Sequence, residues 1–324
     1  MKAFKSPEKL QENYKNAVVV IGNFDGVHMG HQHIFKIARQ KADELGCALG
    51  VLTFSPHPRA FFQQDSSSFY LMSEEQKREA LARCGVDFVY TQTFDTEFSR
   101  LSAKCFVDQI LSDTLSAQLC GVGFNFHFGH KREGDVNTLQ ALCRERGIQT
   151  LIMDEVQCSA DERYSSSRAR TYIIDADFKA AEGVLGHPWI FEGTVVKGDQ
   201  RGRELGYPTA NQSTGGYIRP PYGVYAVLAR LKGQNLWLPA VANFGVRPMF
   251  RLDEPLLETH IFDFDDEIYG KILQIKFVER IRDEMKFDSL DDLVEQMDRD
   301  SQRAKNILSS EIDSDKHQES RYGS

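Results

Sequence analysis

Two histidines three residues apart, His28 and His31, stand where an apolar run breaks into glycines and a helix begins. The stretch is IGNFDGVHMGHQ, residues 21–32. Its glycines allow close backbone approach, and one helical turn places both imidazoles on the same side. Such rings beside a helix N-terminus suit a phosphate that gains negative charge during a reaction. Taken alone, H-x-G-H fits equally a functional site or a structural turn whose histidines hydrogen-bond locally. A zinc pair is a weaker alternative, because zinc usually needs three or four ligands and nothing nearby supplies an obvious third.

A second chemical motif, GTVVKGDQRGRELGYPTAN, occupies residues 193–211. Its repeated glycines permit a loop that folds its backbone over a phosphate chain, although ordinary turns also explain such a composition. Thr209 and Asn211 offer neutral oxygens two residues apart, which suit Mg²⁺ held jointly with ATP phosphates. Further on, Glu258 stands in an alternating strand-like run, where it fits either a proton acceptor or a solvent-facing partner of His260.

The first half of the chain must position the histidine pair, and it alternates strand-like with helix-like segments. Helices are expected after His28, after the capping serine Ser73 and after Ser102. This rhythm predicts a parallel, doubly wound sheet, in which ligands collect beyond the carboxyl ends of the strands. The strand-like segments are residues 17–22, 47–54, 86–91, 117–124 and 148–156.

Around residue 187 the helical periodicity largely disappears. Short strands with glycine- or proline-bearing connections predict a small antiparallel barrel or sandwich. A last helix begins after Ser289, with Leu293, Met297, Ala304 and Leu308 on its packing face. The strand-like segments are residues 189–198, 222–231, 236–245, 256–264 and 271–281. The predicted domains are 1–182 and 183–308, followed by a disordered tail, 309–324.

Composition narrows the class of protein. With 324 residues, 41% hydrophobic and 27% charged, the chain is an ordinary globular protein of two domains. Its formal net charge of -8 disfavours nucleic-acid binding but not small anionic ligands. The polar N-terminus and the lack of a long apolar run argue against secretion and membrane insertion. Six cysteines without a CxxC pair suggest neither a zinc site nor a disulfide framework, so a reducing cytoplasm fits best.

The string GNFDGVHMGHQ resembles the nucleotidylyltransferase superfamily related to class I aminoacyl-tRNA synthetases, and within it the bacterial FAD synthetase module. Four further stretches are similar to that module, and the resemblance covers about residues 15–182. It implies adenylyl transfer, in which the phosphate of FMN attacks the α-phosphorus of ATP and pyrophosphate leaves. The four stretches are TFSPHPR (53–59), LMSEEQK (71–77), GFNFHFGHKREGD (123–135) and YSSSRAR (164–170).

This resemblance assigns His28 and His31 to catalysis on the phosphate chain. It implies flavin contacts for Arg59, Phe61, Phe62 and Asn125, although the two phenylalanines are equally suited to anchoring their long loop to the core. His127 stands where many relatives have arginine, which leaves its role open. The residues implied to bind ATP and its phosphates are Gly22, Asn23, Phe24, Asp25, Gly30, Ser166, Ser167 and Arg170.

The motif of residues 193–211 closely resembles the riboflavin kinase signature, and the agreement covers about 183–308. It continues through VANFGVRP (241–248), LETHIFDF (257–264), IYGK (268–271) and KFDSLDDLVEQMDRD (286–300). The resemblance implies that Glu258 orients the ribityl 5′-hydroxyl of riboflavin and that Thr209 and Asn211 hold Mg²⁺. Tyr207 stands where phenylalanine is common. The remaining implied residues are Gly198, Gly202, Arg203, Gly206, Tyr207 and Pro208 for ATP phosphates, with Asn243 and Arg247 supporting the site.

Both resemblances together predict a bifunctional enzyme that converts riboflavin to FMN and FMN to FAD with ATP and Mg²⁺. Three alternatives stay open from the residues: a single activity with one half kept as a flavin-binding module, a non-catalytic flavin carrier, and an adenylyltransferase for another phosphate acceptor. We expect small-molecule substrates only, with neither nucleic acid nor membrane as a partner. Weak self-association is left open.

Overall fold

The computed structural model describes residues 1–63, 68–154, 163–198, 205–246 and 255–322. The chain forms two compact units, which we call the first and the second unit. The first comprises Met1–Ser66 and Ser73–Ser166, and the second comprises Ser67–Met72 and Ser167–Ser324. The predicted domain boundary lies after residue 182, whereas the structure assigns residues 167–182 and a short segment from the first half to the second unit.

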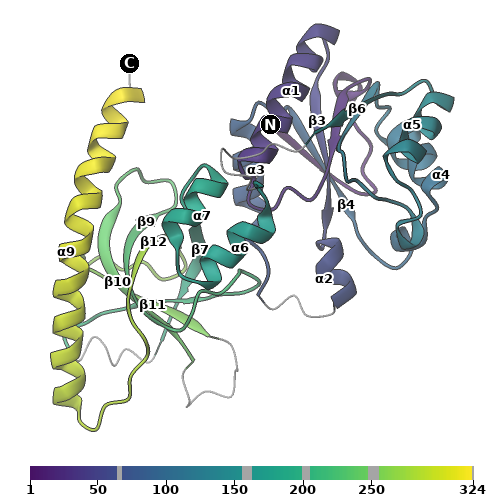
Figure 1. Ribbon diagram of the computed structural model, residues 1–324. Helices are drawn as coiled ribbons and strands as arrows, with labels where there is room; N and C mark the ends of the chain where they lie inside the picture. Colours follow the sequence, from purple (N-terminus) through teal and green to yellow (C-terminus); the bar gives the residue numbers. More distant parts are fainter. Residues whose placement is uncertain (64–67, 155–162, 199–204, 247–254, 323–324) are drawn as a thin grey trace. The chain divides into compact units, whose positions relative to one another are not determined.

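The first unit is built on a six-stranded sheet in which every pair of neighbours is parallel (Figure 1). All four residues of the strand VVVI are buried, which is typical of a sheet covered on both faces. The predicted parallel sheet is confirmed. In spatial order the strands are β1 (Lys2–Lys5), β4 (Phe88–Thr93), β3 (Leu49–Ser55), β2 (Val18–Ile21), β5 (Leu119–Gly123) and β6 (Gln149–Met153).

The strand order changes direction between β2 and β5. From β2 the chain proceeds through β3 and β4 toward one edge, and β5 and β6 extend the sheet on the other side of β2. In open α/β sheets, the crevice beyond the carboxyl ends of the two strands at such a reversal is where ligands bind. The chain after β2 contains His28 and the chain after β5 contains Asn125, so two predicted site segments leave the sheet at neighbouring positions.

Helices follow the strands at the predicted places. The first, α1 (Met29–Leu45), ends at Gly46, which adopts the left-handed conformation that favours glycine. Ser73 caps α3 (Glu74–Arg83) in a capping box with Gln76. The other helical segments are η1 (Glu12–Tyr14), α2 (Pro58–Gln63), η2 (Phe98–Arg100), α4 (Ala103–Cys105), the π-helical η3 (Phe106–Thr114), η4 (His130–Arg132) and α5 (Val136–Glu145).

Two short elements of the first unit differ from the sequence prediction. The edge strand β1 was not predicted, because only Phe4 of its four residues is buried and the segment has no alternating pattern long enough to recognise. Residues 56–72 were expected to form a loop, but Pro58 opens the helix α2. Proline suits the first helical position, where its fixed φ is already helical and no N–H is needed.

The second unit contains a closed six-stranded barrel with antiparallel neighbours, which confirms the predicted architecture. One of the six strands, β8, was missed, because its four residues lie inside the glycine-rich motif and are too few to show a period. In barrel order the strands are β10 (Leu238–Gly245), β11 (Leu256–Ile261), β8 (Ala210–Ser213), β7 (Ile190–Val196), β12 (Ile272–Arg282) and β9 (Gly223–Leu231).

The helix α9 (Leu290–Tyr322) runs along the outside of the barrel (Figure 1). Ala304 and Leu308 are fully buried there against residues of β9 and β12, as the sequence predicted. The expected disordered tail is corrected in part, because the helix continues through residue 322, and propagating an existing helix costs far less than starting one. The remaining helices are α6 (Ser166–Ile174) and α7 (Phe178–Leu185).

The segment Ser67–Met72 lies within the first half of the sequence but packs in the second unit. The backbone N–H of Phe69 donates to the carbonyl of Gly216 at 2.8 Å. The indole N–H of Trp189 donates to the carbonyl of Leu71 at 2.9 Å, and this bond is buried. The segment is therefore an integral part of the barrel unit.

No helix among the described residues is long and apolar enough to cross a membrane. The five cysteines in the described ranges are free thiols.

We expect the ion pair between Arg282 of β12 and Asp300 of α9 to stabilise the second unit strongly. The Asp300 side chain is only 6% exposed and accepts from Nε and a terminal nitrogen of Arg282 at 2.7 to 3.1 Å. Asp300→Ala leaves a largely covered guanidinium, 18% exposed, without its carboxylate and should lower the free energy of unfolding by about 3 kcal/mol.

Urea unfolding followed by tryptophan fluorescence measures this, because the chain's two tryptophans, Trp189 and Trp237, both belong to the second unit. Glu295→Gln, which removes a carboxylate from an exposed pair with Arg299 on the same helix, is the control and should change little. Equal midpoints for the two variants would contradict the expectation.

Candidate active sites

The corner between β2 and α1 is a sharp and strained turn. Phe24 and Val27 have φ angles of 52° and 37°, and Gly26 between them has 82°. A positive φ is unusual for any residue with a side chain, and most of all for β-branched valine. The side-chain amide of Gln32 donates to the Val27 carbonyl at 2.9 Å and so holds the turn against the helix. Strain of this kind persists where the surrounding structure enforces it, often at functional sites.

The two histidines lie face to face at this corner. The rings of His28 and His31 stack with centroids 3.6 Å apart and planes 24° from parallel, and the Phe24 ring meets His31 edge-on at 5.0 Å. His28 is only 7% exposed. Burial, and secondly the charge of neighbouring His28, holds the pKa of His31 well below its usual value. His31 is therefore neutral at physiological pH and can offer an N–H without carrying a charge.

Polar atoms at the corner lack partners. Nδ1 of His31 and Oδ1 of Asn23 are buried and make no hydrogen bond within the described residues. The N-cap residue of α1 is His28, and its side chain makes no capping bond to the first turn of the helix. Buried polar groups and helix N-termini normally find partners, so the arrangement points to a ligand with polar or anionic groups. Among the described residues, no group of three or more histidines, cysteines and carboxylates could hold a metal ion.

Two glycines of the corner itself and one serine from much later in the chain complete its structure. A Cβ at Gly30 would lie 3.2 Å from the His28 ring, and one at Gly22 would lie 2.7 Å from the Phe24 ring. The Ser166 hydroxyl donates to the backbone carbonyl of buried Asp25 at 2.8 Å. The structure thus brings together most of the predicted phosphate-binding residues of the first unit, namely Gly22, Asn23, Phe24, Asp25, Gly30 and Ser166.

Ser167 and Arg170, also predicted to bind ATP phosphates, belong to the second unit. The Arg170 side chain is buried there, with its guanidinium 3.9 Å from the centre of the Phe69 ring. Its Nε donates to the carbonyl of Phe69 at 2.8 Å. The structure thus gives Arg170 a role in holding the segment Ser67–Met72.

The predicted flavin residues of the first unit follow the strands on either side of β2. Phe61 and Phe62 lie in α2, after β3, and their rings stand 5.3 Å and 5.8 Å from that of Phe94. Phe61 is half-buried, whereas Phe62 is 67% exposed. Asn125 follows β5, and its carbonyl lies 2.9 Å from Nδ1 of His127. The packing on Phe94 supports the anchoring interpretation for Phe61, and the exposed ring of Phe62 leaves a face for stacking.

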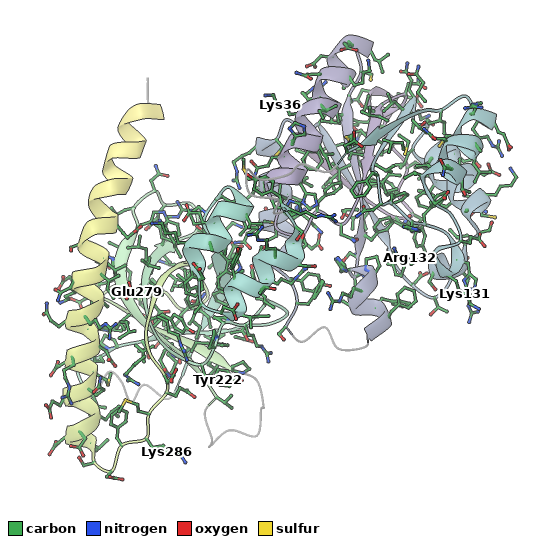
Figure 2. The ribbon with its side chains drawn as sticks, viewed as in Figure 1. Lys36, Lys131, Arg132, Tyr222, Glu279 and Lys286 are labelled. Atoms are coloured by element: carbon green, nitrogen blue, oxygen red, sulfur yellow. The ribbon has the colours of Figure 1, made fainter. Side chains whose placement is uncertain are left out.

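Arg59, the other predicted flavin residue of α2, is exposed. Its backbone N–H donates to Nδ1 of His57 at 3.1 Å. Two further cations of the first unit, Lys131 and Arg132 of η4, lie in the chain after β5 (Figure 2). Both have positive φ angles, 51° and 62°. With His130 they form a basic run inside the stretch GFNFHFGHKREGD, and the sequence analysis assigns them no role.

In the second unit, strand register brings three predicted residues into one row. Glu258 of β11 pairs with Asn211 of β8 on one side and with Asn243 of β10 on the other. Residues paired directly across antiparallel strands share one face, with Cβ atoms about 5 Å apart. The predicted catalytic carboxylate, a predicted metal ligand and a predicted supporting amide, distant in sequence, therefore lie side by side.

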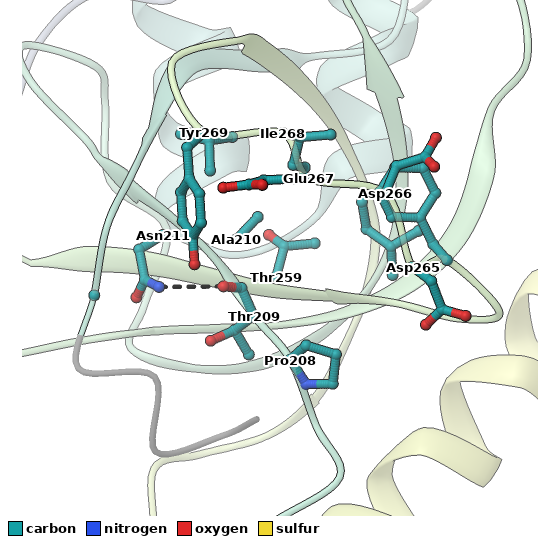
Figure 3. Close-up of a pocket in the computed structure, with 14 residues that line it drawn as sticks. Pro208, Thr209, Ala210, Asn211, Thr259, Asp265, Asp266, Glu267, Ile268 and Tyr269 are labelled. Atoms are coloured by element: carbon teal, nitrogen blue, oxygen red, sulfur yellow. Dashed lines mark hydrogen bonds between the residues drawn. The ribbon is translucent and has the colours of Figure 1, made fainter. Parts of the chain in front are cut away.

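Next to this row is a pocket of about 310 Å³ (Figure 3). Thr209 and Asn211 line it together, with the Asn211 amide nitrogen 3.2 Å from the Thr209 carbonyl. A Cβ at Gly198 would lie 2.6 Å from that amide, so only glycine lets the backbone approach so closely. Hydroxyl and amide oxygens on one pocket wall are ligands that Mg²⁺ accepts together with phosphate oxygens, so the residues present fit the predicted metal.

The opposite wall of the pocket was not assigned from the sequence. Its residues are Phe264, Asp265, Asp266, Glu267, Ile268 and Tyr269. The IYGK stretch was the available signal, but single residues in it carried no chemical argument. Of the other predicted residues, Pro208 lines the pocket and Gly206 precedes it with a φ of 83°. Gly202, Arg203 and Arg247 lie outside the described residues.

Comparison with known proteins agrees with this division. The FAD synthetase family matches residues 10–168 and the riboflavin kinase family matches residues 185–308. A bifunctional riboflavin kinase/FMN adenylyltransferase from Haemophilus influenzae is 38% identical over 91% of this chain and 96% of its own length. One from Bacillus subtilis is 36% identical over 91% and 93%.

Among solved structures, a Streptococcus pneumoniae protein described as a macrolide-efflux protein is 30% identical, with a TM-score of 0.81 over 94% of this chain and 99% of its own. The description as a macrolide-efflux protein belongs to the Streptococcus pneumoniae protein and is not carried over to this chain. The relatives from Haemophilus influenzae and Bacillus subtilis span both units, and the two family matches follow one another along the sequence. The chain therefore belongs to the family of bifunctional riboflavin kinase/FMN adenylyltransferases.

Proposed function

We propose that the stacked pair His28–His31 performs adenylyl transfer in the first unit and that the row Asn211–Glu258–Asn243 performs riboflavin phosphorylation in the second. The observation that supports this most is that each set of residues converges in space within its own compact unit. The enzyme thus uses one ATP to make FMN and a second to make FAD.

In the first unit, an oxygen of the FMN phosphate forms a bond to the α-phosphorus of ATP. The bond from that phosphorus to the bridging oxygen breaks, and pyrophosphate leaves. Negative charge increases on the α-phosphate and the leaving group, where N–H donors stabilise it. His31, neutral and with a buried ring nitrogen that has no hydrogen-bond partner among the described residues, is suited to hydrogen-bond this charge, together with His28 and the first turn of α1.

In the second unit, Glu258 accepts the proton of the ribityl 5′-hydroxyl as its oxygen forms a bond to the γ-phosphorus and ADP leaves. Thr209 and Asn211 would hold Mg²⁺, which neutralises charge on the ATP phosphates when bound. Asn243 neighbours Glu258 in the register and orients it.

We infer that the enzyme works in the cytoplasm on small molecules alone. Its cysteines, where described, are free thiols, and its formal net charge of -8 does not favour nucleic acids or anionic membranes.

The direct test is incubation of the purified chain with riboflavin, ATP and Mg²⁺, followed by chromatographic separation of the flavins. We expect FMN first and FAD later, under oxidising or reducing conditions. Formation of FMN alone would favour a single-activity enzyme. Tight flavin binding without ATP consumption would indicate a carrier and would refute both proposed activities.

Single-site variants should separate the two reactions. Glu258→Gln removes the proton acceptor, so we expect the rate of FMN formation to fall by about 100- to 10,000-fold. FAD formation from supplied FMN should stay unchanged. His31→Ala removes a donor to the developing charge, so FAD formation should fall by about 100- to 1,000-fold while FMN formation persists. Loss of both reactions in either variant, with the chain still folded, would show that the residue assignment is wrong.

The lowered pKa of His31 predicts how stability depends on pH. The unfolded chain binds a proton at this imidazole near pH 6.5, whereas the folded first unit binds it only at lower pH. The first unit should therefore lose stability as pH falls below about 6.5. Imidazole NMR of the unliganded protein measures the pKa directly, and His31→Gln should flatten this part of the stability profile. Titration of His31 at its ordinary value would contradict the prediction.

Gly30→Ala tests whether the position of the His28 ring matters. A methyl group would sit 3.2 Å from that ring and force it to move by a few tenths of an ångström. We expect FAD formation to fall by about tenfold or more, because small displacements of catalytic groups are costly. Gly183→Ala is the control, since a Cβ there meets open space within a helix. Wild-type FAD formation in Gly30→Ala would mean that the ring position is not critical.

A further inference from the structure

Tyr207 connects the nucleotide segment of the second unit to the C-terminal helix. It follows Gly206 and directly precedes Pro208 and Thr209, which line the pocket. Its hydroxyl donates to a carboxylate oxygen of Asp298, 91 residues later on α9. Phenylalanine, which the resemblance to the riboflavin kinase signature leads us to expect here, would keep the ring but could not form this bond. The contact is therefore a feature of this chain that the general motif does not require.

The aromatic ring has its own, separate support. It meets the imidazole of His260 on β11 at 5.1 Å in an edge-to-face arrangement, and Nδ1 of His260 lies 2.9 Å from the carbonyl of Pro208. These contacts do not need the hydroxyl. Replacing only the hydroxyl should therefore leave the ring packed and remove the hydroxyl's interactions with α9, which are the bond to Asp298 and a weaker interaction with Ser301.

Asp298 is a well-fixed acceptor, because it lies two residues before the point at which α9 is held on the barrel, and the start of the helix is capped. Ser289 caps the first turn through its bond to the Asp292 N–H. Asp300 is held by Arg282, and Ala304 is fully buried on the barrel. A hydrogen bond from Tyr207 to such a helix restrains the segment that carries Thr209 more than a bond to a loop would.

The phenol also remains a donor at every pH used for assays. Burial and the nearby Asp298 carboxylate raise the pKa of Tyr207 to about 12. The hydroxyl therefore keeps its proton at neutral pH. A hydrogen bond to a charged acceptor is stronger than one between neutral groups.

We infer that Tyr207 is a positioning residue of the kinase pocket, whose hydroxyl fixes the segment from Gly206 to Thr209 to α9 through Asp298 in the geometry that binds ATP and Mg²⁺. The inference rests on the proposed assignment of this pocket to ATP. Tyr207 acts through Thr209 and Asn211, and it makes no contact with the reacting atoms. Its contribution is the ordering of the segment before ATP arrives, so the effect should appear in ATP binding rather than in the chemical step.

The test is steady-state kinetics of riboflavin phosphorylation by the full chain carrying Tyr207→Phe. We expect the KM for MgATP to rise by about three- to tenfold, the equivalent of one hydrogen bond, with kcat nearly unchanged. Asp298→Ala should give the same rise, and the double variant should give no more than either single one. Asp298→Asn, which keeps a neutral acceptor, should give an intermediate KM.

Two controls distinguish positioning from general damage. Glu295→Gln removes a carboxylate from an exposed position of the same helix and should leave KM unchanged. Tryptophan fluorescence should show an intact second unit in Tyr207→Phe, and FAD formation from supplied FMN should be normal. A KM within twofold of wild type in Tyr207→Phe, or fully additive effects in the double variant, would overturn the inference. Absence of riboflavin phosphorylation in the wild-type chain would instead refute the proposed function.

Discussion

The stack of two imidazoles at the start of α1 depends on a backbone that turns more tightly than most residues allow. Phe24 and Val27 hold positive φ angles, each at a cost on the order of 1–3 kcal/mol. Phe24 is also the residue whose ring meets His31 edge-on and covers Gly22. Phe24 thus contributes to the strain of the corner through its φ angle and to the ring packing that offsets that strain. A relaxed turn would lose the ring packing that keeps His31 buried and neutral.

The second site is positioned by strand register instead of by strain. Gln212 is fully buried, and its amide donates to the carbonyls of Gly193 and Leu273 at 2.8 Å and 2.9 Å. A slip of β8 by one residue would turn this amide outward and exchange the faces of the strand. The buried glutamine therefore fixes the phase in which its neighbour Asn211 pairs with Glu258. The register of this short strand is therefore fixed by a buried side-chain amide that donates two hydrogen bonds.

The sequence was sufficient to predict elements with a regular apolar pattern and segments with a chemically distinctive motif. The apolar run of β2 and the cap at Ser73 belong to the patterns that predicted the sheet and the barrel, which the structure confirms, and the two motif sets predicted two candidate sites. It was insufficient for β1 and β8, which are as short as β2 but lack its continuous apolar run, so that neither a run nor a period marks them. It could not foresee that Arg170 packs against Phe69, 101 residues away, because a motif identifies a residue but not its packing partner. No role was assigned to the segment 264–269, because no single residue in it carried a chemical argument.

The path of the chain through Ser67–Met72 has a consequence for how such an enzyme can be rearranged. These residues are encoded between α2 and α3 of the first unit, yet their hydrogen bonds to Gly216 and Trp189 lie in the second. A single cut in the chain cannot release two complete halves, because the barrel would always lack a piece encoded upstream. Gene fission or an exchange of halves between distant relatives would therefore need matching changes on both sides of the junction, which favours inheritance of the two activities as one chain.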